Sequence, residues 1–390
     1  MKINPAKRTE TVQEYYFSRK LKEIAEIKSR GINIINLGIG SPDTPPSAST
    51  IDKLIESSKN PKNHGYQSYN GIPELRNALA VWYKKYYNLE LNPKNEILPL
   101  MGSKEGIMHI SMAFINEGDE VLVPNPGYPT YQSVSNLVGA KIIYYNLKEE
   151  NNWLPDINEL EKENLDNVKL MWVNYPNMPT GAGSTKELFQ NLVDFGLRNN
   201  ILICNDNPYS FILNDRQQSI LEAKGAKEIA LELNSLSKSH SMAGWRIGMV
   251  AGNEEYINTI LKVKSNMDSG MFLPLQQAAV EALKNSEQWF NNVNEIYGER
   301  RQIVFEILDL LNCKYNRDQT GLFVWAKISD EFENGEKFSN YILKRANVFI
   351  TPGSVFGSNG DSYIRISLCT EKIALFEVKS RIATLIQNNL

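Results

Sequence analysis

The feature that most constrains the fold of this chain is a repeated alternation of short apolar runs with longer segments of helical periodicity. The apolar runs cover residues 97–101, 121–124, 141–147, 169–173, 201–204, 229–233 and 247–251. Such alternation is typical of a mostly parallel sheet whose strands are joined and covered by helices. The sequence therefore predicts an α/β fold, and in such folds ligands bind beyond the carboxyl ends of the strands.

A second lobe is predicted from the last part of the chain. Residues 286–311 have the pattern of one long helix, and strands of antiparallel character (322–328, 348–351, 363–368) then alternate with helices at 337–345 and 372–388. We expect an N-terminal helix (14–30) and strand (32–37) to pack with this lobe. The 390 residues exceed one typical domain. We therefore predict an N-terminal arm with part of the small domain (1–46), a large domain (47–285) and a small α+β domain (286–390).

One lysine stands in an unusual setting within residues 235–248. Lys238 follows Ser235 and Ser237, and Arg246 comes eight residues later among glycines. A lysine amine forms a Schiff base with an aldehyde, and burial near other cations frees the amine by lowering its pKa. Serine hydroxyls and an arginine can hold a phosphate through charge-assisted hydrogen bonds. The mixture indicates pyridoxal phosphate, an aldehyde cofactor that carries a phosphate; the alternative is a loop whose lysine and arginine are solvated.

Two predicted strand ends supply groups that suit a planar ring. Asp206 comes just after the apolar run 201–204, and Tyr209 follows three residues later. An aspartate at the end of a buried strand can pair with a protonated pyridine nitrogen, and the tyrosine can reach a ring hydroxyl. Tyr128 follows the run 121–124 and offers an aromatic face for stacking. Because these strand ends meet at one edge of the sheet, we expect a single site.

Two further segments supply groups that bind anions. Gly102, Ser103 and Lys104 open a predicted helix, whose first backbone N–H groups and dipole attract negative charge. The alternative for Ser103 is simple helix capping. Arg365 lies in the strand predicted at 363–368, where an inward arginine suits the bidentate binding of a carboxylate.

Taken in order, these residues resemble the class I/II aminotransferases of the aspartate aminotransferase fold, which is fold type I among pyridoxal-phosphate enzymes. Segments 15–17, 37–43, 102–106 and 266–270 are most similar to the LL-diaminopimelate aminotransferase branch. Transaminases of alanine, aspartate and aromatic or branched amino acids share much of the pattern. The resemblance implies an enzyme that moves an amino group from an L-amino acid to a 2-oxo acid, with pyridoxal phosphate held by the large domain.

The resemblance also implies individual roles. It makes Lys238 the catalytic residue that holds the cofactor, and it places Gly40 and Tyr15 beside Arg365 at the substrate. It makes Tyr66 a residue that reaches the phosphate of the neighbouring subunit, which implies a homodimer with shared active sites. The alternative for Tyr66 is a turn aromatic that packs locally.

One position departs from the family pattern. Directly before Pro-Thr-Gly the family has an asparagine that hydrogen-bonds the ring hydroxyl, but here the residue is Met178, which cannot donate. Asn177 is adjacent and should point elsewhere in an extended chain. Either Tyr209 alone serves the ring hydroxyl or the ring lies differently. The departure leaves room for a diverged substrate or a reduced activity.

Several other classes of protein are disfavoured. Gly38 and Gly40 follow a predicted strand as in dinucleotide-binding proteins, but Asp43 occupies the third glycine position and Pro42 blocks the opening of a helix. The net charge of −3 gives no electrostatic case for nucleic acid or an anionic membrane. No apolar run approaches the ~18 residues of a membrane span.

The histidines and cysteines indicate neither a metal site nor a disulfide framework. His64, His109 and His240 lack metal-ligand spacing, so we expect no metal. The widely spaced and odd-numbered cysteines, Cys204, Cys313 and Cys369, suit reduced thiols in the cytoplasm. The first ten residues are polar and lack an apolar signal-peptide core, so we expect a cytoplasmic protein.

Two rival functions stay open at this stage. The first is a β-lyase or carbon–carbon-forming synthase on the same scaffold, which would not couple keto-acid formation to consumption of an amino acceptor. The second is a non-catalytic or regulatory relative, which the full set of site residues disfavours. The substrate side chain is not identified. Residues 262–277 contain no arginine for a distal carboxylate, although Lys104 can serve one.

Overall fold

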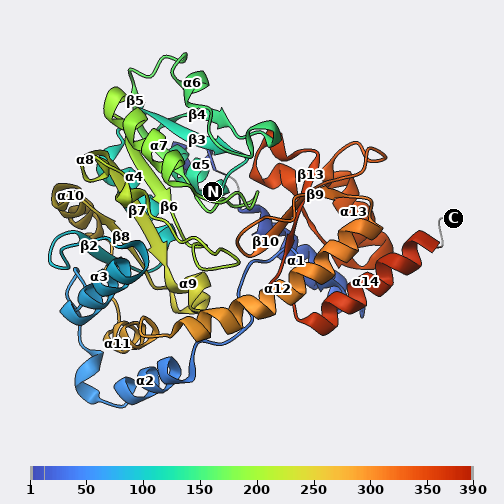
Figure 1. Ribbon diagram of the computed structural model, residues 1–390, viewed down its shortest axis with the longest axis horizontal. Coiled ribbons are helices and arrows are strands. Elements are labelled where there is room, and N and C mark those ends of the chain that lie inside the picture. The colour runs from blue at the N-terminus through green and yellow to red at the C-terminus, as the bar shows by residue number, and fades with distance from the viewer. Residues whose placement is uncertain (1–2, 13, 388–390) are drawn as a thin grey trace.

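The computed structural model describes residues 3–12 and 14–387, which form two lobes joined by one long helix (Figure 1). This helix, α12, spans Glu287–Leu310 and runs from the lobe with the larger sheet to the lobe with the C-terminal helix. It begins at Ser286, whose side chain accepts a hydrogen bond from the backbone N–H of Trp289 as an N-cap. In the described part of the chain, no helix combines the length and apolar character that a membrane crossing needs.

The larger lobe is built on a seven-stranded sheet with the order β2-β8-β7-β6-β5-β3-β4. In that order the strands are Ile97–Leu100, Gly248–Gly252, Ala230–Ser235, Leu202–Asp206, Val168–Val173, Glu120–Asn125 and Lys141–Asn146. The pairs are parallel except those of β8, which is antiparallel to both β2 and β7. The predicted α/β class is confirmed, and each predicted strand of this sheet begins and ends within two residues of the observed one.

Helices cover both faces of this sheet because both faces are apolar. In β5, Trp172 packs with Tyr131 on one face, whereas Met171 and Val173 pack with Phe189 on the other. The long helices of the lobe are α3 (Pro73–Tyr87), α4 (Ser103–Phe114), α5 (Pro129–Leu137), α7 (Lys186–Asn199) and α10 (Glu254–Lys264). Short helices are α6 (Ile157–Leu160), α8 (Ala226–Ile229) and α9 (Leu236–Ser239), and α2 (Ala48–Ser58) lies beside α11 (Leu273–Ala282) at one end (Figure 1).

The smaller lobe contains a four-stranded antiparallel sheet with the order β12-β13-β10-β9. Its strands are Thr351–Pro352, Tyr363–Ser367, Phe323–Lys327 and Lys314–Tyr315, and its helices are α13 (Gly335–Ala346) and α14 (Lys372–Gln387). The N-terminal part of the chain packs here, as the sequence predicted. Ile24 of α1 (Tyr16–Ser29) contacts the cluster around Phe349, and β1 (Ile35–Asn36) pairs in parallel with β11 (Val348–Phe349).

Two predicted strands of this lobe were wrong in extent. The strand predicted at 32–37 is only the two-residue β1, and the strand predicted at 348–351 is divided into β11 and β12. At Ile350 the chain leaves its partner β1 and joins β13, so one apolar run serves two sheets. The predicted end of the last helix, Asn388, lies outside the described residues. The division of the chain into domains at 46/47 and 285/286 stays a proposal.

Candidate active site

A cavity of about 320 Å³ lies where the carboxyl ends of β6 and β7 face the smaller lobe. It gathers residues from the larger lobe, from the crossing segment 38–41 and from β10 and β13. The predicted site residues that line it are Tyr15, Gly40, Ser103, Lys104, Tyr128, Asp206, Tyr209, Ser235, Ser237, Lys238, Arg246 and Arg365. Residues that are far apart in the sequence therefore share one space, as expected for ligands bound beyond strand ends.

Lys238 projects from α9, the single helical turn that follows β7. Ser235 caps this turn by accepting a hydrogen bond from the backbone N–H of Ser237. The amine of Lys238 donates to the backbone oxygen of Gly40, 2.5 Å away. Desolvation by burial lowers the pKa of this amine, and the nearby Arg365 and Arg246 lower it further, whereas Cys369 raises it. A lysine with a lowered pKa is closer to the neutral form that attacks an aldehyde or accepts a proton.

Asp206 ends β6 and is almost fully buried. Tyr131 donates its hydroxyl to Oδ2 of Asp206 at 3.0 Å, and Tyr131 stacks on Trp172 with 5.2 Å between ring centroids. The other oxygen, Oδ1, is buried without a hydrogen-bond partner. Desolvation raises the pKa of Asp206 to about 6, against the lowering effect of hydrogen bonds from Tyr131 and Ser103. A protonated ring nitrogen at Oδ1 would satisfy the orphan oxygen and stabilise the carboxylate.

The start of α4 forms an anion-binding cradle with Arg246. Gly102 precedes the helix with a φ of 89°, and a Cβ there would come within 2.3 Å of Nη2 of Arg246. The guanidinium also donates to the carbonyl of Ala243 at 2.8 Å and reaches Oγ of Ser237 at 3.5 Å. Because backbone N–H groups, hydroxyls and a guanidinium converge here, the cradle suits a phosphate. The glycine leaves the room that the anion and the arginine need.

Arg365 lies on β13 with its side chain buried in the cavity wall. Nη2 donates to the carbonyl of Gly38 at 2.9 Å, and the guanidinium lies over the ring of Phe323, 3.8 Å from its centroid. Nε is buried without a partner. Burial lowers the pKa of Arg365 to about 10, a value at which the group is still charged at neutral pH. A buried, charged guanidinium with an unused donor is suited to bind a carboxylate.

Met178, the residue that departs from the family pattern, faces the same cavity. Its sulfur accepts from Nη1 of Arg365 at 3.1 Å. The amide of Asn177 points away from the cavity, because it donates to the carbonyl of Asn174 and accepts from the hydroxyl of Thr180. A thioether therefore lies directly beside the guanidinium of Arg365.

Tyr15 and Lys104 form another part of the cavity wall. The ammonium of Lys104 lies over the ring of Tyr15, 4.9 Å from its centroid. Burial lowers the pKa of Lys104, and Arg246 lowers it further. This lysine is thus a further basic group in the cavity, in addition to Lys238, Arg246 and Arg365.

Two predicted site residues do not line the cavity: Gly102, which lies against Arg246 just before α4, and Tyr66. The side chain of Tyr66 is 93% exposed. Met178, which was singled out from the sequence, does line the cavity. The sequence reasoning missed other cavity residues: Phe17, Leu21, Gly38, Ile39, Ser41, Tyr131, Asn174, Pro208, Ala243, Phe323 and Phe356. For Tyr131 a signal existed, since it stands in the first turn of α5, three residues after Tyr128, the N-cap of that helix.

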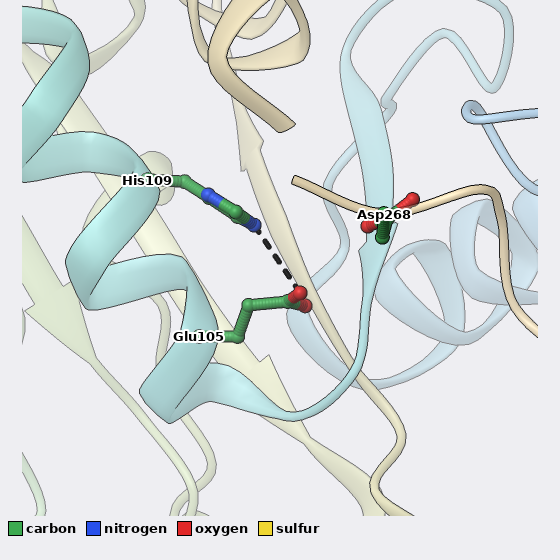
Figure 2. A group of neighbouring side chains, drawn as sticks. All are labelled: Glu105, His109 and Asp268. Carbon is green, nitrogen blue, oxygen red and sulfur yellow. Dashed lines mark ion pairs between the residues drawn. The ribbon is translucent and has the colours of Figure 1, made fainter. Parts of the chain in front are cut away.

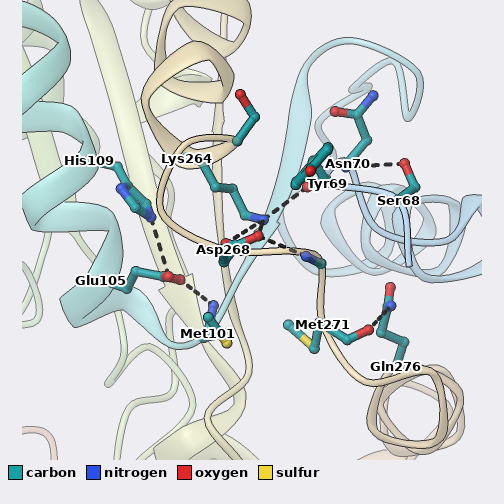
Figure 3. Close-up of polar contacts among 12 residues, drawn as sticks. Ser68, Tyr69, Asn70, Met101, Glu105, His109, Lys264, Asp268, Met271 and Gln276 are labelled. Carbon is teal, nitrogen blue, oxygen red and sulfur yellow. Dashed lines mark hydrogen bonds and ion pairs between the residues drawn. The ribbon is translucent and has the colours of Figure 1, made fainter. Parts of the chain in front are cut away.

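A separate polar cluster lies behind the phosphate-type cradle. Glu105 and His109, one turn apart on α4, approach to 3.3 Å, and Asp268 completes a group whose ligand-type atoms lie within 4.8 Å of one another (Figure 2). Lys264 already ion-pairs with Asp268 at 2.8 Å and donates to the carbonyl of Tyr69 (Figure 3). An ammonium beside the carboxylate disfavours a second cation. We interpret the cluster as structural, and the absence of a metal site stays a prediction.

Comparisons with known proteins agree with this geometry. Residues 32–375 match the family model of aminotransferase class I and II. The LL-diaminopimelate aminotransferase of Dehalococcoides mccartyi is 40% identical over 365 residues, covering 93% of this chain and 94% of the relative. The enzyme of the same name from Maridesulfovibrio salexigens is 40% identical over 383 residues, covering 97% and 98%.

Solved structures with the same fold cover almost the whole chain. Substrate-bound BacF from Bacillus subtilis has a TM-score of 0.94 at 36% identity and covers 99% of this chain and 98% of its own. The aromatic aminotransferase of Pyrococcus horikoshii OT3 has a TM-score of 0.86 at 30% identity, with 95% and 99% covered. This chain belongs to the class I and II aminotransferases and is a transaminase of fold type I.

Proposed function

We propose that the chain is a pyridoxal-phosphate-dependent transaminase whose amino donor is LL-diaminopimelate and whose acceptor is 2-oxoglutarate. The observation that carries the cofactor proposal is one cavity that combines a buried amine at Lys238, an orphan carboxylate oxygen at Asp206 and the phosphate-type cradle at Arg246. The names of the relatives and the additional basic group, Lys104, support a donor with two carboxylates. We also propose a cytoplasmic location, which the free thiols support.

Different residues would contact different parts of the cofactor. Ser103, Ser235, Ser237 and Arg246 would hold the phosphate, Asp206 would keep the ring nitrogen protonated, and Tyr128 and Tyr209 would contact the ring. When bound, pyridoxal phosphate supplies an aldehyde carbon that bonds to amines and a ring that accepts the electron pair released at Cα. Burial raises the pKa of Tyr209, so its phenol stays a donor for the ring hydroxyl at neutral pH.

Substrate binding and proton transfer involve groups from both lobes. Arg365 would bind the α-carboxylate and so direct Cα toward Lys238. The freed amine of Lys238 would take the Cα proton, while the carbonyl of Gly40 holds one of its N–H groups and so aims the lone pair. Lys104 would bind the distal carboxylate of the donor.

A screen of amino donors tests the proposed substrate. LL-diaminopimelate should react with 2-oxoglutarate and release one glutamate for each keto acid formed, which a lyase or synthase would not do. Activity with aromatic donors and none with LL-diaminopimelate would overturn the substrate but not transamination. Keto acid without glutamate would indicate a lyase.

The change Arg365→Lys should raise the Michaelis constant for amino acids by ~10–100-fold, because a lysine loses one of two charge-assisted hydrogen bonds to the carboxylate. The visible absorbance band of the holoprotein should stay unchanged, and a simple amine without a carboxylate should react almost as before. Loss of the band with an unchanged Michaelis constant would instead place Arg365 in the cofactor site.

We also propose that the protein is a homodimer in which Tyr66 reaches the partner's phosphate. Two contacting segments, 64–72 and 264–276, present exposed apolar side chains, among them Tyr66, Tyr69, Met267 and Phe272. An exposed patch of this kind is typical of an interface. The partner copy would cover this patch, and Tyr66 would then extend into the partner's active site.

Mixed dimers test this sharing. An equal mixture of Lys238→Ala and Tyr66→Ala chains should be more active than either parent, because one site of each hybrid then has an intact lysine and an intact partner tyrosine. The matched control is Lys238→Ala mixed with Arg365→Lys, which should show no gain since both groups belong to the same subunit's site. No gain in the Tyr66 mixture, or a monomer of full activity, would refute sharing.

A further inference from the structure

The crossing segment 37–43 places two backbone carbonyls at the candidate active site. Gly38 accepts from Arg365 at 2.9 Å, and Gly40 accepts from Lys238 at 2.5 Å. A Cβ at Gly38 would come within 2.4 Å of Phe349, and one at Gly40 within 2.1 Å of the ring of Phe323. The segment is therefore tightly packed, and its exact course decides where both carbonyls lie.

The far end of the segment is held by an ion pair outside the cavity. Nη1 and Nη2 of Arg300 contact the two oxygens of Asp43 at 2.7 and 2.8 Å, which is a bidentate pair. Arg300 lies on α12 and is 6% exposed. A bidentate guanidinium–carboxylate pair fixes direction as well as distance, which a single hydrogen bond does not.

The same arginine also reaches the strand that carries the substrate-binding residue. Nη1 of Arg300 donates to the carbonyl of Leu368 at 3.1 Å, three residues after Arg365. The backbone N–H of Ser367 in turn donates to the carbonyl of Leu37 at 2.8 Å. Arg300 is thus bonded to both chain segments that meet at Arg365, although neither it nor Asp43 lines the cavity.

We propose that Asp43 and Arg300 are positioning residues of the transaminase. Their ion pair fixes segment 37–43 so that Gly38 orients the guanidinium of Arg365 and Gly40 orients the amine of Lys238. This inference rests on the proposed function, since it needs Arg365 to bind the carboxylate and Lys238 to act as the base. A group that acts only on fold stability would leave both of these properties unchanged.

The test uses holoprotein carrying Asp43→Asn, Arg300→Lys or both, because these changes keep a hydrogen bond but remove the bidentate ion pair. The first measurement is the binding of α-methylglutamate, which cannot lose a Cα proton and so reports binding alone. Each variant should bind it at least ~10-fold more weakly, and the double variant little more weakly than either single one, since the two residues act through one contact. The pH midpoint of the visible absorbance band should shift as well.

The matched control is Arg198→Lys, which alters an exposed ion pair with Glu161 far from the cavity; its binding and its pH midpoint should equal those of the wild type. Asp43 and Arg300 variants that bind α-methylglutamate within twofold of the wild type would overturn the inference, even if their melting temperature falls. A wild-type protein without a visible band would overturn the proposed function and this inference with it. The presence or absence of the visible band in the wild type therefore distinguishes a failure of the inference from a failure of the proposed function.

Discussion

The change Lys238→Ala should lower transaminase turnover by at least ~10⁴-fold, the upper range of a positioned general base, because the same side chain also supplies the amine that bonds to the cofactor. Alanine can do neither. The amine of Lys238 has a lowered pKa and donates to the carbonyl of Gly40. Among the residues that line the cavity, Lys104 is the other lysine that could replace it. Turnover is measured with saturating donor, acceptor and pyridoxal phosphate.

Two further measurements tie this effect to Lys238. Borohydride treatment of the wild type should fix the cofactor to the peptide that contains Lys238, as mass spectrometry would detect. The control Lys227→Ala removes an exposed lysine that pairs with Glu96 and should leave turnover unchanged. A Lys238→Ala protein with wild-type turnover, or a label found on Lys104, would refute the assignment.

The change Asp206→Ala should lower turnover by at least ~100-fold, the scale of one strong electrostatic contribution to a transition state. Without the carboxylate, no negative charge would keep the ring nitrogen protonated, so the ring would accept the electron pair from Cα less readily. The control Asp52→Ala removes an exposed carboxylate on α2 and should have no effect. A loss smaller than threefold would show that Asp206 only supports the end of β6.

Asp206 should also give the cofactor-free protein a characteristic dependence of stability on pH. Burial raises its pKa from the usual 3.8 to about 6, so between these values the folded chain binds more protons than the unfolded chain. The unfolding free energy therefore loses this contribution as the pH rises through about 6. Compared with the wild type, the Asp206→Asn variant should become relatively more stable from pH 4 to 7 in thermal denaturation. A constant difference would contradict a buried, titrating carboxyl.

Much of the site could be predicted because its chemistry lies at strand ends. Asp206 follows an apolar run, and the run itself places the residue at the ligand-binding edge of a parallel sheet. The packing around it could not be predicted in the same way. Tyr131 contributes the hydroxyl that bonds to Asp206 from a helix, and Met178 meets Arg365 across the two lobes, so both contacts depend on how distant segments pack.

The order of the strands was also beyond the sequence pattern. Apolar runs identify which residues form strands, but they do not predict which strands pair with each other in the sheet. The late strand β8 inserts between β2 and β7 and runs against both, although its run looks like the others. In the smaller lobe, the run 348–351 contained no signal for the change of partner at Ile350, because apolar residues suit both sheets equally.

The helix α12 connects the two lobes that carry Lys238 and Arg365, the groups that a substrate would touch at once under the proposed function. Lys238 belongs to α9 and Arg365 to β13. These two elements lie in the lobes at opposite ends of α12 (Figure 1). A ligand that engages only one of the two residues would contact one lobe, whereas an amino acid would contact both. Under the proposed function, a simple amine can meet Lys238 alone, whereas an amino acid is also held by Arg365 through its carboxylate. Free amines in the cell lack the group that Arg365 would bind, so under the proposed function the division of the two groups between the lobes would favour amino acids over them.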